Sequence, residues 1–73
     1  MNAQDILNTL KTGAYTVTFR KADGSLRTMQ GWAPAETVIR TTGIVPIIEM
    51  GTFTFKSFRA DSLISISEFN PFV

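Results

Sequence analysis

The stretch FKSFRADSLISI, at residues 55–66, decides the fold of this chain. It couples an aromatic strand to a charged turn and then to a second apolar strand, an order typical of the closing strands of a very small β-barrel. We expect its Phe, Leu and Ile side chains to form core. Arg59 and Asp61 flank Ala60 in the turn, where we expect a local ion pair or hydrogen bonds from backbone amides to Asp61.

The two strands predicted around this turn cover residues 53–58 and 63–67, and residues 68–73 form a tail after them. Aromatic and β-branched residues favour strands, and alternation places every second side chain on the same face. The side chains expected to face inward are Phe53, Phe55, Ile64 and Ile66.

A further strand is predicted over residues 44–50, but its Pro46 cannot donate a hydrogen bond to a neighbouring strand. We therefore expect this strand to lie on a sheet edge or to contain a bulge. Residues 33–43 break the alternating pattern, since Pro34 starts a turn or a short helical piece. An irregular loop is expected there.

Residues 14–21 alternate between apolar and polar side chains. This period of two indicates a strand that is buried on one face only. The side chains assigned to the inner face are Tyr15, Val17 and Phe19, and those assigned to the outer face are Thr16, Thr18 and Arg20.

A hairpin loop is predicted at residues 22–24, with Gly24 in the left-handed conformation beside a bulge. This loop places Met29 opposite Val17 in a second strand over residues 25–32. A two-residue Asp-Gly loop would instead reverse the faces of the second strand, because a shift of one residue exchanges inward and outward side chains.

A helix is predicted over residues 3–12, because Asn2 is a favourable N-cap and Gly13 provides a stop. Its narrow apolar stripe is expected to pack on the sheet, although a partner-binding helix is the alternative. The stripe consists of Ile6, Leu7 and Leu10.

Together these elements predict a mainly β fold, a small SH3-like barrel of about five antiparallel strands preceded by one short helix. A chain of 73 residues is expected to hold a single domain over residues 1–73. Hydrophobic residues make up 44% of it and charged residues 18%, which favours a globular protein over a disordered one.

Composition also restricts the function. The chain has no cysteine and no histidine, so the commonest zinc ligands and the commonest general base are missing. Its acidic residues are scattered without metal-loop spacing, and we expect no catalytic residue, no cofactor and no metal site. A formal net charge of +1 is small for a protein that depends on phosphate contacts. The longest nearly uncharged run is too broken to span a membrane, and a cytoplasmic location is expected.

The first candidate partner-binding surface is basic. Arg20, Lys21 and Arg27 cluster on the predicted hairpin, where they could meet an acidic protein surface or a few phosphates. The structural alternative is a solvated hairpin that keeps the protein soluble.

The second candidate surface pairs Trp32 with Arg40 beside the irregular loop, because an exposed tryptophan can anchor a partner. The alternative role for Trp32 is a core plug under that loop. The tail, with Phe69 and Phe72, is the third candidate surface. We expect it either to fold back over one end of the barrel or to stay exposed as a contact segment.

Two blocks, YTVTFRKADGSLRTM at residues 15–29 and the stretch 55–66, resemble a family of small phage-encoded proteins with an SH3-like barrel. The second block also resembles the end of the WYL-type barrel of bacterial regulators, although residues 37–50 lack the Trp-Tyr-Leu strand of that pattern. The phage resemblance implies a non-enzymatic protein in the cytoplasm of an infected bacterium. Proteins of this kind are often regulators that bind host machinery, with host RNA polymerase a frequent target.

Two functions follow from these observations. The first is a regulator that binds bacterial RNA polymerase through a protein–protein contact and alters host transcription, using the basic hairpin and the neighbouring loop. The alternative is a nucleic-acid-binding barrel, in which the basic residues lie beside strand aromatics such as Tyr15 and Phe53. The small net charge favours the first. No membrane partner is expected, and the oligomeric state is left open.

Overall fold

The computed structural model describes residues 1–70 as one helix and a five-stranded antiparallel sheet of order β4-β3-β2-β1-β5. This confirms the predicted mainly β fold with one short N-terminal helix. Among the described residues no ladder joins β4 to β5, so the sheet is open, whereas we expected a closed barrel. The elements are α1 (Ala3–Leu10), β1 (Tyr15–Arg20), β2 (Leu26–Trp32), β3 (Ile44–Glu49), β4 (Thr54–Arg59), the 3₁₀ turn η1 (Ala60–Ser62) and β5 (Leu63–Glu68).

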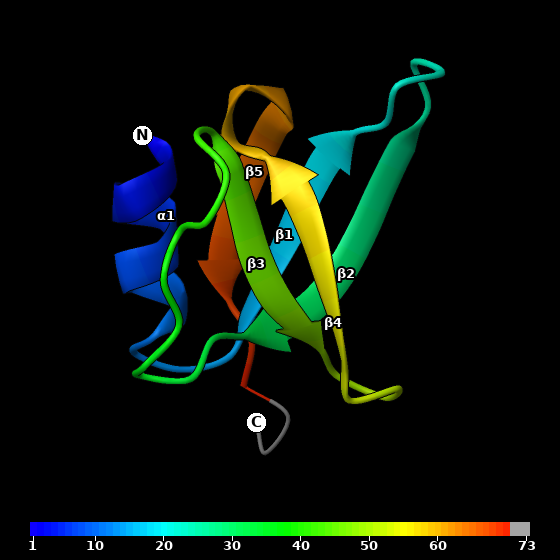
Figure 1. Ribbon diagram of the computed structural model, residues 1–73. Coiled ribbons are helices and arrows are strands. Elements are labelled where there is room, and N and C mark those ends of the chain that lie inside the picture. The colour runs from blue at the N-terminus through cyan, green and yellow to red at the C-terminus, as the bar shows by residue number, and fades with distance from the viewer. Residues whose placement is uncertain (71–73) are drawn as a thin grey trace.

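The sheet curls so that its two halves face each other across the core. Figure 1 shows β3 and β4 on the near side, β1 and β5 behind them, and α1 along the flank at β3 and β5. Curling lets a small sheet enclose apolar side chains, and the helix covers the side that the strands leave open. The buried side chains are Ile6, Leu7, Leu10, Val17, Phe19, Met29, Ala33, Val45, Ile47 and Phe58.

Helix α1 begins as the sequence predicts but ends earlier. Asn2 is the N-cap, and its side-chain oxygen accepts a hydrogen bond of 2.8 Å from the backbone N–H of Asp5. At the other end the N–H and the hydroxyl of Thr12 both bond the carbonyl of Thr9, at 3.0 and 2.7 Å, which closes the helix after Leu10. The apolar stripe of the helix packs into the core, as expected.

The first hairpin has the predicted register. Val17 lies opposite Met29, and Gly24 adopts a φ of 89°, in the left-handed region that favours glycine. The loop is closed by the Lys21 N–H, which bonds the Ser25 carbonyl at 2.7 Å. Leu26 is consequently on the outer face and 56% exposed, whereas Met29 is buried.

Pro46 lies in a strand with a neighbour on each side and a continuous register against β4, so the prediction of an edge strand or a bulge was wrong. β3 is flanked by β4 on one side and β2 on the other, but the β2–β3 ladder consists of only Gly31 opposite Glu49 and Trp32 opposite Ile48. β2 ends at Trp32, before it reaches the position opposite Pro46, so no ladder on that side needs the missing N–H.

The last strand faces the core differently from our expectation. Ile66 lies opposite Val17, but the register of β5 against β1 shifts at Phe19, whose partner is Leu63. The shift leaves Ile64 as the extra residue of a bulge, which turns its side chain outward, and Ile64 is 56% exposed. Leu63 packs against the core in its place.

The aromatic side chains near β4 are also distributed differently from our expectation. Phe55 is 62% exposed and Phe53 is 73% exposed, so neither faces the core. Phe53 is a turn residue with φ 54°, outside the strand, and β4 directs Phe58 inward instead. Its ring stacks on that of Phe19, with the ring centroids 5.2 Å apart. Phe55, three positions away on the same strand, therefore occupies the opposite face.

The beginning of the tail follows β5 along the sheet. Phe69 is partly buried, and its N–H bonds the Ala14 carbonyl at 3.0 Å. The expectation for Phe72 falls on residues 71–73, outside the part of the chain that the structure describes.

Candidate functional site

An apolar groove lies on the outer face of β3 and β4, where the loop of residues 33–43 crosses that face. It encloses about 430 Å³. Phe55 and Val38, which are 62% and 58% exposed, are the largest solvent-exposed apolar side chains along it. The residues that line the groove are Glu36, Thr37, Val38, Arg40, Thr41, Ile44, Pro46 and Phe55.

The groove continues into a row of large side chains that crosses the sheet. Trp32 of β2 and Phe55 of β4 both lie opposite Ile48 of β3, from its two sides. Side chains that are directly opposite in an antiparallel ladder share a face, so the three form one strip beside the groove. Trp32 is partly exposed, which places it on the outer surface and not under the loop as a core plug.

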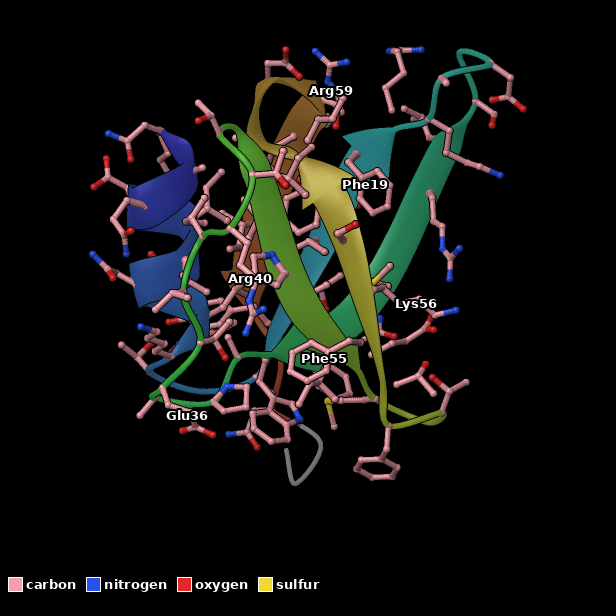
Figure 2. All side chains as sticks on the ribbon, viewed as in Figure 1. Phe19, Glu36, Arg40, Phe55, Lys56 and Arg59 are labelled. Atoms are coloured by element: carbon pink, nitrogen blue, oxygen red, sulfur yellow. The ribbon has the colours of Figure 1, made fainter. Side chains whose placement is uncertain are left out.

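Charged side chains stand on the loop side of the groove. Figure 2 shows Arg40 and Phe55 on the same side of β3, with Glu36 further along the loop. Within residues 1–70 Arg40 forms no ion pair. An apolar surface with a charged rim is the anatomy of a protein-binding patch. Of the predicted pair Trp32 and Arg40, the groove includes Arg40, and Trp32 lies next to it.

The basic hairpin cluster is divided by the register of the sheet. Arg20 lies opposite Leu26, and Arg27 lies opposite the buried Phe19, so the two arginines occupy different faces. Arg27 forms an ion pair with Glu49, whose carboxylate oxygen is 3.0 Å from its Nη2. The structure therefore does not bring Arg27 together with the other two basic residues.

Arg20 and Lys21 instead lie near the turn that precedes β5. Together with Arg59 and Asp61 they line a shallow hollow that also includes the outward-facing Ile64. Arg20 Nη1 additionally donates to the Gly24 carbonyl at 2.7 Å. This grouping depends on the pairing of β1 with β5, which joins distant parts of the chain.

The turn of residues 59–62 contains the ion pair that the sequence predicts. Arg59 donates from Nε and Nη2 to the two carboxylate oxygens of Asp61, at 3.1 and 3.0 Å. These hydrogen bonds, and then the charge of Arg59, hold the pKa of Asp61 below its ordinary value. A hydrogen bond from the Ser25 side chain is the first cause of the lowered pKa of Asp23 in the hairpin loop.

These lowered carboxyl pKa values predict a loss of stability in acid. Asp61 has a lower pKa in the folded chain than in the unfolded chain, so its stabilising effect is complete above about pH 4 and disappears as the pH falls further. Asp61→Asn should therefore show a smaller decrease of the urea midpoint between pH 5 and pH 2 than the wild type. Arg59→Gln, which removes the partner, should show the same reduction. Parallel decreases in all three proteins would contradict this role of the ion pair.

Phe55 and Val38 are candidate-site residues that the sequence prediction did not select. The strand itself gave no signal for Phe55, because Phe55 shares a face with Ser57 and Arg59, and Phe58 shares the other face with the equally polar Thr54 and Lys56. Val38 lies in an irregular loop, where no period assigns a face. Its exposure depends on how the loop crosses β3.

The fold and the groove define a small open-sheet β protein with an exposed apolar face. No protein-family model matches the chain, and neither the curated proteins nor the solved structures give a significant match. Residues 1–70 contain no helix with the length and apolarity needed to cross a membrane. In the same part of the chain, no group of three or more acidic side chains is placed to hold a metal ion.

Proposed function

We propose that this protein is a non-enzymatic, phage-encoded regulator that binds bacterial host machinery through a protein–protein contact, with RNA polymerase as the first candidate partner. The observation that carries the proposal is the groove with Phe55 and Val38 exposed at its surface. Exposed apolar patches bordered by polar groups mark interaction sites, and aromatic side chains in such patches carry much of the binding energy.

The choice of partner rests on the phage resemblance of residues 15–29 and 55–66. A regulator of this kind works in the cytoplasm of the infected cell, where host transcription takes place. The contact surface we propose differs from the one expected from sequence alone. It is centred on Phe55 and Arg40, with Trp32 at its border, and leaves Arg27 in its ion pair with Glu49.

Capture of host proteins on the immobilised chain tests the proposal. The wild type is expected to retain RNA polymerase subunits from bacterial lysate at concentrations well above micromolar. Phe55→Ser should reduce the retained amount at least about tenfold, since aromatic anchors are typical hot spots. Leu26→Ser is the matched control, because Leu26 is 56% exposed but does not line the groove.

Equal retention by the Phe55 and Leu26 variants would contradict the groove as the contact surface. If the wild type retained no polymerase subunit, RNA polymerase would be excluded as the partner.

Titration with labelled single- and double-stranded DNA at low salt tests the nucleic-acid alternative. That alternative would rely on Arg20 and Lys21 with Arg59, of which Arg59 is already paired with Asp61. We expect no salt-dependent binding to DNA.

A further inference from the structure

The outer edge of β4 is uncovered beside the groove. β4 is the last strand on its side of the sheet, and every residue from position 54 to position 57 is exposed. An edge strand presents backbone N–H and C=O groups that have no partner in its own sheet. Such an edge can accept an additional strand from another protein.

The hydrogen bonds of the β3–β4 ladder identify the free backbone groups. The Ala60 N–H bonds the Gly43 carbonyl at 2.8 Å, in line with the ladder that pairs Ile44 with Arg59. Alternate residues of a strand direct their backbone groups to opposite sides. It follows that Phe55 and Ser57 direct theirs away from β3, toward the open edge.

The position of Pro46 agrees with this assignment. Pro46 lies opposite Ser57, and a proline has no N–H to give to β4. Pairs with and without mutual hydrogen bonds alternate along an antiparallel ladder. If Pro46 and Ser57 form a pair without them, the proline interrupts no hydrogen bond between β3 and β4. The N–H of Ser57 is therefore available at the outer edge.

The side chains of β4 determine which kind of strand would fit. Phe55 lies on the groove face, whereas Lys56 lies opposite Ile47 and so belongs to the other face. Figure 2 shows Phe55 and Lys56 leaving β4 in different directions. Within residues 1–70 Lys56 has no ion-pair partner, so a cation is free on this edge, as Arg40 is beside the groove.

We propose that the β4 edge binds an extended segment of the partner protein as an added strand, with an acidic side chain opposite Lys56 and an apolar side chain opposite Phe55. The inference rests on the proposed function, because it assumes that the partner is a protein, and it adds the mode and chemistry of recognition. A second copy of this chain fits less well: its β4 would bring another Lys56, and residues 54–58 contain no acidic side chain.

Amide hydrogen exchange with two synthetic peptides of about ten residues tests this inference. One peptide alternates valine and glutamate, and the other alternates valine and lysine. In the free protein the amides of Phe55 and Ser57 should exchange faster than those of Lys56 and Phe58, since only the latter two bond β3. The acidic peptide at ten times its Kd should slow exchange at Phe55 and Ser57 about tenfold. The basic peptide should leave both rates unchanged.

Variants of β4 separate the backbone and charge contributions. Lys56→Glu should reverse the preference, so that the basic peptide slows exchange and the acidic one does not. Ser57→Pro should abolish binding of the acidic peptide, because it removes an edge N–H, while Ser57→Ala keeps that N–H and should bind the acidic peptide as the wild type does. If the proline variant fails to fold, the reversed peptide preference of Lys56→Glu still tests the inference.

Several outcomes would overturn the inference. Equal protection by both peptides, or protection that spares Phe55 and Ser57, would exclude charge-selective strand addition. Protection at these amides that rises with protein concentration alone would assign the edge to a second copy. Undiminished polymerase capture by Lys56→Glu would overturn the edge inference and leave the proposed function. If the wild type binds the acidic peptide but captures no polymerase, the edge inference is supported and RNA polymerase is excluded as the partner.

Discussion

Replacement of Phe58 by alanine is expected to lower the free energy of unfolding by roughly 3–5 kcal/mol. Phe58 is 4% exposed, and its ring stacks on Phe19 with an interplanar angle of 14°. The two rings connect β4 with β1, strands that share no ladder, so the cavity left by alanine would open between the two halves of the curled sheet. Urea unfolding followed by circular dichroism measures the loss.

Phe55→Ala provides the matched control for this prediction. It removes the same side chain from the same strand, but at a position that is 62% exposed. The free energy of unfolding should change by no more than about 0.5 kcal/mol, as for ordinary surface substitutions. Equal losses in the two variants would mean that the stacked ring pair is not a core contact.

Replacement of Gly31 by alanine is expected to cost roughly 3 kcal/mol, at the upper end of the usual effect of overpacking. A Cβ at this position would lie 2.5 Å from the Ile48 carbonyl oxygen and 2.7 Å from Cδ1 of Ile47. The oxygen belongs to the backbone of the neighbouring strand and cannot turn aside like a flexible side chain. The short β2–β3 ladder would have to separate, which thermal and urea unfolding would both detect.

Gly13→Ala is the control for the glycine substitution, because nothing lies within 4 Å of its Cβ position. We expect the stability of this variant to stay within about 0.5 kcal/mol of the wild type. Similar melting temperatures for the Gly13 and Gly31 variants would argue against a close approach of β2 to β3.

Local sequence patterns predicted the elements whose partners are near in the chain. The cap at Asn2 and the left-handed Gly24 are formed by residues only a few positions apart, and the structure contains both. The register of Val17 against Met29 follows from the length of one loop. In these cases the chemistry of a short segment leaves few alternatives.

The face of a strand that turns to the core could not be predicted where it depends on pairing with distant strands. β3 is apolar at most positions, so its pattern does not show which face of β4 turns inward. Phe55 and Phe58 were therefore both assigned to the core. The bulge at Ile64 arises from pairing with β1 and has no signal in β5 itself. These nonlocal contacts decide which apolar side chains remain in solvent.

The candidate site was predicted in part for the same reason. Arg40 and Trp32 were selected because an exposed tryptophan beside an irregular loop can anchor a partner, and both lie in or beside the groove. Arg27 was grouped with Arg20 because they lie on neighbouring strands of the predicted hairpin, but Arg20 pairs with Leu26, the residue before Arg27, so the two arginines are on different faces. The groove itself needs Val38 and Phe55, which only the folded chain brings together.

The position of β1 between β2 and β5 has a consequence for biosynthesis. β2 follows β1 directly, so their hairpin can form on a microsecond timescale once both have left the ribosome. β5 is made last of the strands, and until residues 63–68 have emerged one side of β1 has no partner. Until then the nascent chain carries an open strand, a state in which a chaperone or another nascent chain can compete for it.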